Sequence, residues 1–158
     1  VVVIGAGHVG KAVVHLAKWL GFRVAVSDDR AEFCTPEAIP GADVYYPVAM
    51  ENLAEQLTVT NQTYLVVTSR GSGVDAVGLP SLLASNAAYI GVIGSKRRWA
   101  TTVRALKEVG VEDALIEKVH SPIGLELQAE TPEEIAVSIM AEILLIRDKG
   151  SGASMKTS

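Results

Sequence analysis

The sequence of 158 residues contains a single cysteine, Cys34, and few aromatic residues. An internal disulfide is therefore excluded, and we expect a protein of the reducing cytoplasm. Aromatic residues make up 5% of the chain, charged residues 20% and hydrophobic residues 49%, a composition typical of one globular domain. No cation or second cysteine neighbours the thiol in the sequence, so we interpret Cys34 as an inert, partly buried side chain.

The chain also lacks a surplus of positive charge and a long apolar run. Its net charge of −4 disfavours binding to nucleic acid, because non-specific affinity for phosphate backbones depends on excess Lys and Arg. No stretch approaches the roughly 20 apolar residues that cross a bilayer, so we expect no membrane partner. Any anion site must then be local. The start on an apolar stretch without Met suggests that residues, or a whole domain, precede Val1.

Several catalytic signatures are missing as well. No Tyr has a Lys four positions later, as short-chain dehydrogenases do, and neither G-x-S-x-G nor a Walker A motif occurs. His8, His15 and His120 are scattered and show no metal-ligand spacing. We therefore predict no metal site and no catalytic residue. An enzyme that transfers hydride would need a group to handle the substrate proton.

What the sequence does contain is an alternation of short, continuously apolar runs with longer segments of helical period. This alternation predicts an α/β fold: a doubly wound, mostly parallel, Rossmann-like sheet with helices on both faces. Gly78 and Pro80 are expected to make one helix irregular or to split it. The polar residues 150–158 predict a disordered tail, which leaves 1–149 as the cofactor-binding domain. Predicted strands are 1–5, 23–28, 43–46, 63–68 and 88–93; predicted helices are 8–20, 51–57, 74–84, 96–109, 112–118 and 132–149.

The segment GAGHVG follows the first predicted strand and opens a helix. Gly5, Gly7 and Gly10 have G-x-G-x-x-G spacing, which in this context indicates a nucleotide-binding turn. Gly5 permits the tight turn, Gly7 leaves room for a pyrophosphate, and Gly10 lets the helix approach the strand. His8 and Val9 belong to the helix start that favours an anion. The alternative is a tight turn that holds no nucleotide.

Asp28 ends the second predicted strand, 23 positions after Gly5. An acidic residue at this place typically accepts ribose hydroxyls, so Asp28 favours NAD over NADP. Arg30 weakens that preference, because an arginine there could receive a 2′-phosphate. From the motif alone the expected ligand is NAD(P).

A second glycine turn, IGVIGSKRR, ends the fifth predicted strand. Its cations oppose the dipole at the start of the next helix, and a bound anion would relieve the conflict; the alternative is a solvated first turn. The loop after strand four opens at the same edge of the sheet, so we expect three loops to converge on one crevice. The residues predicted to bind anions in these two loops are Ser69, Arg70, Gly94, Ser95, Lys96 and Arg97.

Long segments of the chain resemble a known family. AAYIGVIGSKRRW and SPIGLELQAETPEEIAVSIMAEIL, with GAGHVG and SDDR upstream, are similar to the C-terminal Rossmann domain of the XdhC/CoxI family. Members of that family are accessory proteins of xanthine dehydrogenase and related molybdenum hydroxylases. The resemblance covers the chain up to about Leu145. The family's N-terminal domain has no counterpart here, and Ser72 stands where the family often has His.

The resemblance implies a maturation factor rather than an enzyme with turnover. Such a protein would bind molybdenum cofactor (molybdopterin), protect it during sulfuration and deliver it to an apo molybdenum hydroxylase of the xanthine dehydrogenase type. A separate family N-terminal domain or a sulfur donor would be further partners. Pro122 and Gly124 of the SPIGL segment would form another wall of the pocket.

Two other functions stay open from the sequence. An NAD(P)-dependent oxidoreductase or NAD-binding regulatory domain is favoured by the glycine motif and Asp28, but it lacks a proton-handling group. A pure interaction protein would use the broad apolar face of helix 132–149 to dimerise. We expect a homodimer for the maturation factor too.

Overall fold

Five strands form one parallel sheet in the order β3-β2-β1-β4-β5. The computed structural model describes residues 1–157. Because the chain moves outward from β1 to β3 and then returns to β4, the strand order reverses between β1 and β4. The predicted Rossmann-like α/β class is confirmed. The strands are β1 (Val2–Ile4), β2 (Ala25–Ser27), β3 (Val44–Tyr46), β4 (Tyr64–Val67) and β5 (Tyr89–Val92).

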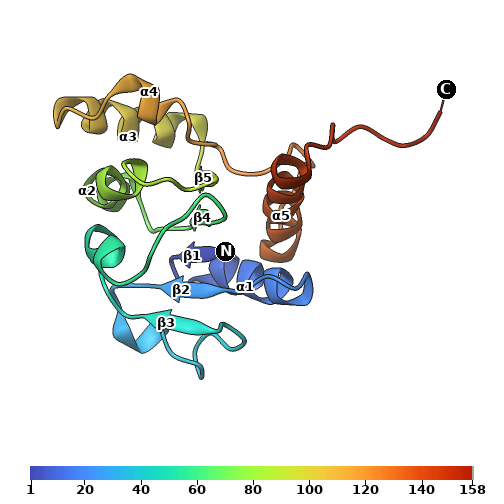
Figure 1. Ribbon diagram of the computed structural model, residues 1–158, viewed down its shortest axis with the longest axis horizontal. Coiled ribbons are helices and arrows are strands. Elements are labelled where there is room, and N and C mark those ends of the chain that lie inside the picture. The colour runs from blue at the N-terminus through green and yellow to red at the C-terminus, as the bar shows by residue number, and fades with distance from the viewer. Residues whose placement is uncertain (158) are drawn as a thin grey trace.

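Helices cover both faces of the sheet (Figure 1). Helices α1 (His8–Trp19) and α5 (Pro132–Asp148) pack on one face, where Val3, Val26 and Val66 point. The other face carries α2 (Ser72–Leu83), α3 (Lys96–Glu108), α4 (Asp113–Ile116) and the 3₁₀ helix η2 (Met50–Glu55). A further 3₁₀ turn, η1 (Ala31–Phe33), follows β2. Since both faces are covered, the strands are apolar without alternation.

Helix α2 differs from its prediction. It starts at Ser72, two residues early, and continues past Gly78 and Pro80 without a break. Gly78 serves packing, because a Cβ there would overlap the side chain of Met50 in η2. The predicted helices 51–57 and 112–118 are present only as the short η2 and α4.

Helix α5 begins as its sequence predicts. The Thr131 hydroxyl accepts the Glu134 N–H at 3.1 Å, and the Glu134 carboxylate accepts the Thr131 N–H at 3.1 Å, which closes a capping box. Residues 150–157 are exposed and form no helix or strand, while Ser158 lies outside the described residues; disorder of the tail stays a prediction. Within residues 1–157, no helix is both long and apolar enough to cross a membrane.

Candidate functional site

The first glycine turn has the geometry that its spacing predicts. Gly5 has φ +116°, and a Cβ there would overlap the Thr68 carbonyl of the neighbouring strand end. At Gly10 a Cβ would overlap the Gly5 carbonyl oxygen, so glycine allows α1 to lie against β1. An added Cβ at Gly7 would meet no atom within 4 Å. The space over Gly7 is therefore open.

Asp28, at the end of β2, is a fully used hydrogen-bond acceptor. Its Oδ2 accepts the Ala6 N–H at 2.9 Å and Arg30 Nη2 at 2.9 Å. Its Oδ1 accepts the Arg30 N–H at 2.9 Å and Arg30 Nε at 3.0 Å. Burial opposes ionisation of Asp28, but the bonds from Arg30 and Ala6 outweigh it and lower the pKa to about 2. Asp28 thus clamps the glycine turn to Arg30.

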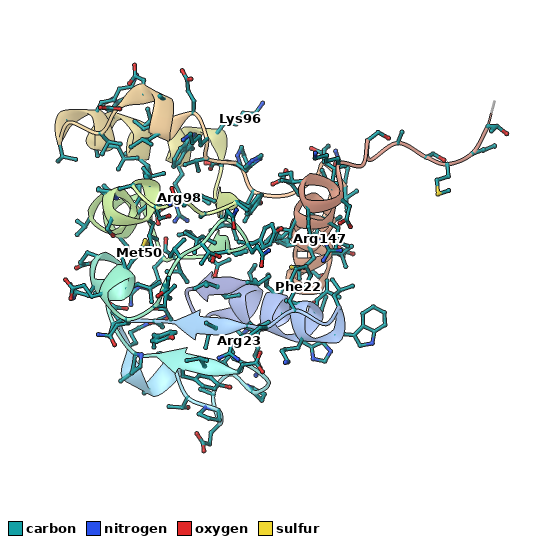
Figure 2. The ribbon with its side chains drawn as sticks, in the orientation of Figure 1. Phe22, Arg23, Met50, Lys96, Arg98 and Arg147 are labelled. Atoms are coloured by element: carbon teal, nitrogen blue, oxygen red, sulfur yellow. The ribbon has the colours of Figure 1, made fainter. Side chains whose placement is uncertain are left out.

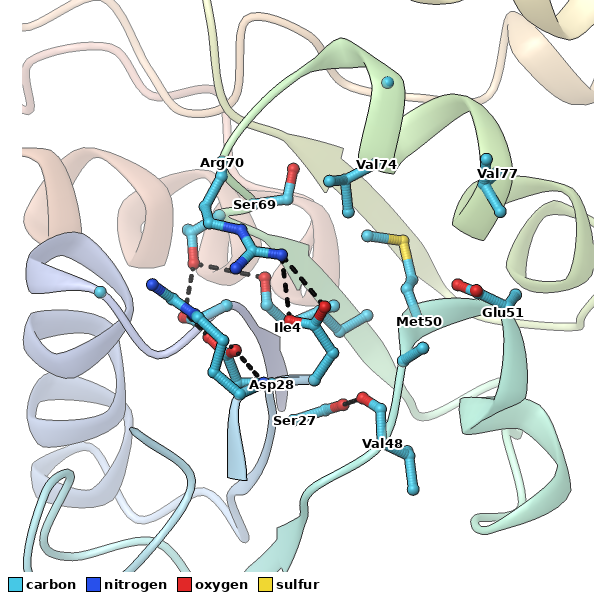
Figure 3. A pocket seen from close by; sticks show the side chains of 17 residues that line it. Ile4, Ser27, Asp28, Val48, Met50, Glu51, Ser69, Arg70, Val74 and Val77 are labelled. Carbon is cyan, nitrogen blue, oxygen red and sulfur yellow. Dashed lines mark hydrogen bonds and ion pairs between the residues drawn. The ribbon is translucent and has the colours of Figure 1, made fainter. Parts of the chain in front are cut away.

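A second ion pair spans the strands on either side of β1. Arg70, in the loop after β4, donates from Nη2 to both carboxylate oxygens of Asp29 at 3.1 Å. Both side chains are 46% exposed, in contrast to the buried Asp28. Figure 3 shows Arg70 reaching across toward the end of β2.

These groups surround a crevice of about 430 Å³ at the carboxyl ends of β1, β2 and β4 (Figure 3). The volume falls within the range of small-molecule pockets, and the place is where open α/β sheets bind ligands. One wall is mainly apolar but includes Glu51 beside Met50, and the opposite rim carries the other charged side chains. Lining residues include Gly5, Gly7, Asp28, Asp29, Arg30, Val48, Met50, Glu51, Ser69, Arg70, Gly73, Val74 and Val77.

The second glycine turn does not reach this crevice, contrary to the expectation that three loops converge. None of Gly94, Ser95, Lys96 or Arg97 is among the described residues that line it. The turn follows β5, one strand beyond β4, and the Arg98 side chain fills the space between that turn and the loop after β4. Figure 2 shows Arg98 pointing toward α2, whereas Lys96 points outward.

The cation of α3 that points into the protein is Arg98 and not Arg97. Its Nη2 donates to Asp75 Oδ2 at 2.8 Å, to Ser69 Oγ at 3.0 Å and to the Ser69 carbonyl at 3.3 Å. Asp75 is fully buried and also accepts the Ser69 hydroxyl. This cluster fixes the loop that presents Arg70 to the crevice. The side chain of Arg97 is exposed.

Lys96 lines a separate cavity of about 500 Å³ together with Pro122 and Gly124. The predicted SPIGL wall therefore belongs to a second hollow, between that segment and the start of α5. His8 is exposed and faces a third cavity between α1 and α5, and the Val9 side chain packs on the core. Of these two residues, only the backbone N–H groups remain as candidates for binding an anion at the start of α1.

Glu142 of α5 anchors the SPIGL segment. Its Oε1 accepts the Tyr89 hydroxyl at 2.6 Å and the Gly124 N–H at 3.2 Å. His120 stacks on Tyr89 with ring centroids 4.9 Å apart, and its Nδ1 lies 3.8 Å from Glu142 Oε1. Burial, and then the bond to Glu142, raise the pKa of Tyr89, so its hydroxyl stays protonated.

The remaining titratable groups offer little chemistry. Cys34 is buried, its Sγ lies 3.6 Å from the Val26 carbonyl, and burial raises the pKa of its thiol. The interpretation of Cys34 as an inert thiol agrees with this environment. Among residues 1–157 there is no cluster of three His, Cys, Asp or Glu side chains able to hold a metal ion.

Comparison with known families matches residues 1–143 to the XdhC Rossmann domain. The chain belongs to the XdhC family. The predicted resemblance is thereby confirmed.

Relatives of this XdhC chain are similar over nearly all of it. The protein YqeB of Escherichia coli (strain K12) is 33% identical over 98% of the chain and 28% of its own length. A protein of Bacillus subtilis (strain 168), named as a probable xanthine dehydrogenase component, is 32% identical over 94% of the chain and 43% of its own length. A crystal structure of a xanthine dehydrogenase from Bacillus halodurans has a TM-score of 0.80 and 29% identity, covering 97% of this chain and 44% of that one. The chain thus spans less than half the length of these relatives.

Four charged residues of the XdhC chain escaped the sequence analysis. Asp29 stands beside the expected ribose acid, Asp75 lies in the predicted helix 74–84, and Arg98 directly follows the predicted anion-binding residue Arg97. Glu142 had a clear signal, because it is an acid in the otherwise apolar run MAEILLI and lies on the buried side of α5. A buried acid needs a partner, and its partners came from β5 and the SPIGL segment.

Proposed function

We propose that this chain is the Rossmann domain of a maturation factor for a molybdenum hydroxylase of the xanthine dehydrogenase type. It holds molybdenum cofactor, or a dinucleotide form of it, in the crevice between β1 and β4 and delivers it to the apo-enzyme. Family membership and the xanthine dehydrogenase names of two relatives support this association.

The observation that carries the proposal is the open space over Gly7, at the N-cap of α1, and over Gly73, in the first turn of α2. An added Cβ at Gly7 or Gly73 would meet nothing within 4 Å, and both glycines line the crevice. The N-cap of α1 is Gly7, without a side-chain cap, so the first N–H groups of this helix lack a side-chain partner. Such a helix start binds phosphate well.

The rest of the crevice fits the two ends of a phosphorylated pterin. Met50, Val74 and Val77 offer an apolar wall for a planar ring, and Arg30 and Arg70 supply positive charge for a phosphate. The bound cofactor would supply the molybdenum chemistry that the client hydroxylase uses. The residues of this chain would orient the ligand and shield it from water.

Titration with molybdenum cofactor tests the proposal. We expect saturable binding by the wild type and at least tenfold weaker binding by Gly7→Val, because the added side chain fills the phosphate space. Gly150→Val is the matched control, since Gly150 lies at the end of α5, away from the crevice. Circular dichroism checks that both variants fold. Absence of binding, alone and with a family N-terminal domain, contradicts the proposal.

The second candidate, an NAD(P)-dependent oxidoreductase or regulatory domain, receives less support from the geometry. All four acceptor positions of Asp28 are taken by Ala6 and Arg30, so a ribose hydroxyl would have to displace the arginine. Thermal shift with NAD and NADP separates the two functions. Strong stabilisation by NAD, together with hydride transfer to a small carbonyl compound, would favour the enzyme.

A further inference from the structure

We propose that Arg70 receives the phosphate or pyrophosphate group of the ligand, and that Asp29 competes with that group for Arg70 in the free protein. Asp29 is then the residue that sets the affinity of the crevice for anions. The inference rests on the proposed function only in placing the ligand in this crevice.

The geometry of the pair carries the first step. Arg70 Nη2 lies 3.1 Å from each oxygen of Asp29, and the two side chains come from opposite sides of β1, after β4 and after β2. Both line the crevice, and each is 46% exposed. Exposed ion pairs contribute little free energy, so an entering anion can replace Asp29 at small cost.

The other arginine of the crevice cannot be exchanged in this way. Arg30 donates from Nε and Nη2 to Asp28, whose side chain is only 4% exposed. Withdrawing Arg30 would leave a buried carboxylate without its cation, which is strongly unfavourable. Among the described lining residues, Arg70 is therefore the cation that a ligand can take over.

The charge of the crevice explains why Asp29 matters for affinity. Asp28, Asp29 and Glu51 oppose Arg30 and Arg70, so the described lining carries a net charge of −1 without a ligand. The geometry of a guanidinium suits a carboxylate and a phosphate equally well. A phosphate group with more negative charge than Asp29 therefore replaces it at Arg70. Once displaced, Asp29 still repels the anion. Both effects of Asp29 weaken anion binding.

Calorimetric titration with inorganic pyrophosphate tests this exchange. We expect Asp29→Asn to tighten binding about two- to fivefold, since it removes the competitor and its charge. Arg70→Gln should weaken binding at least tenfold. In the double variant, Asp29→Asn should bring much less gain, because the contested arginine is gone. Lys107→Gln, which breaks the exposed pair with Asp113 outside the crevice, should change nothing.

Two results of the pyrophosphate titration would overturn the inference. One is Asp29→Asn binding pyrophosphate no more tightly than the wild type, which would make the pair a mere surface ion pair. The other is undiminished pyrophosphate binding by Arg70→Gln. Failure of this inference can be told apart from failure of the proposed function. If the wild type and Arg70→Gln bind molybdenum cofactor equally well, the inference alone is refuted. Pyrophosphate binding in the expected order without cofactor binding refutes the maturation role alone. Thermal unfolding confirms that each variant is folded.

Discussion

Asp28 occupies the position that a nucleotide-binding motif predicts, but its side chain has a different role in this protein. Its position after β2 is that of a ribose-binding acid, yet its oxygens accept four N–H donors from Ala6 and Arg30. A carboxylate with two oxygens has about four acceptor positions. The side chain therefore stabilises the glycine turn, and the neighbouring Asp29 is the exchangeable acid.

The Asp28 clamp makes stability sensitive to acid. The folded pKa of about 2 lies below the ordinary value of 3.8, so the stabilisation is complete above about pH 4 and is lost as the pH falls through 2. The shift corresponds to about 2 kcal/mol. We expect the difference in free energy of unfolding between wild type and Asp28→Asn to shrink by that amount from pH 5 to pH 2, measured by urea denaturation. A difference independent of pH would contradict the clamp.

At the scale of elements, the three cations at the start of α3 have two different roles. Lys96 and Arg97 are exposed, while Arg98 turns inward to the buried Asp75 (Figure 2). Ser95 caps the helix by accepting the Arg98 N–H at 3.1 Å. The third cation of the KRR run therefore connects α3 to the loop of Arg70.

Replacing Arg98 should destabilise the fold more than replacing its neighbour. Arg98→Met leaves Asp75 buried without its cation, for which we expect a loss of about 3–5 kcal/mol in free energy of unfolding. The matched variant Arg97→Met should change stability by less than about 0.5 kcal/mol, because that side chain is exposed. Chemical denaturation compares the two, and similar losses would refute the division of roles.

Helix α5 holds the SPIGL segment through one buried acid. Glu142→Ala removes the acceptor of both the Tyr89 hydroxyl and the Gly124 N–H, so we expect a loss of about 2–4 kcal/mol. Tyr89→Phe removes only one donor and should cost about 1 kcal/mol. Thermal melts measure these losses. Glu133→Ala, on the exposed side of α5, serves as the control in these melts. Equal effects of Glu142→Ala and Glu133→Ala would exclude an anchoring role.

At the scale of the molecule, the apolar stripe of α5 is buried within the fold. Ile139 and Ile143 are fully buried against α1 and the sheet, and Ile135 and Ile146 pack beside them. The large apolar side chains exposed near this region include Trp19, Leu127 and Val137. A second copy of the chain would not reach Ile139 or Ile143, whereas the exposed side chains are available to a dimer interface on this side.

The homodimer stays a prediction that light scattering can check. We expect a particle of about twice the chain mass of 16.7 kDa. Trp19→Ser and Val137→Ser should then lower the dimer fraction without unfolding the protein, because both side chains are exposed. A particle of one chain mass at all concentrations would contradict the expectation.

Periodicity was enough to predict the sheet and most of its helices, because it depends on patterns that lie close together in the chain. The family was predicted from the resemblance of longer segments. The places of Gly5 and Gly10 were predictable from a local motif, because only glycine fits a tight turn between a strand and a close helix. The capping box of α5 was equally local. These features follow from neighbours within a few residues.

By itself, then, the sequence determined the α/β architecture, the glycine turn at the end of β1 and the membership of the family. Only the tertiary structure decided which polar side chains meet: Asp28 with Arg30, Asp29 with Arg70, Asp75 with Arg98, and Glu142 with Tyr89. It also placed the second glycine turn outside the crevice. The physical reason is that three of these four pairs join separate elements, and their partners depend on strand order and helix rotation, which short-range patterns do not encode.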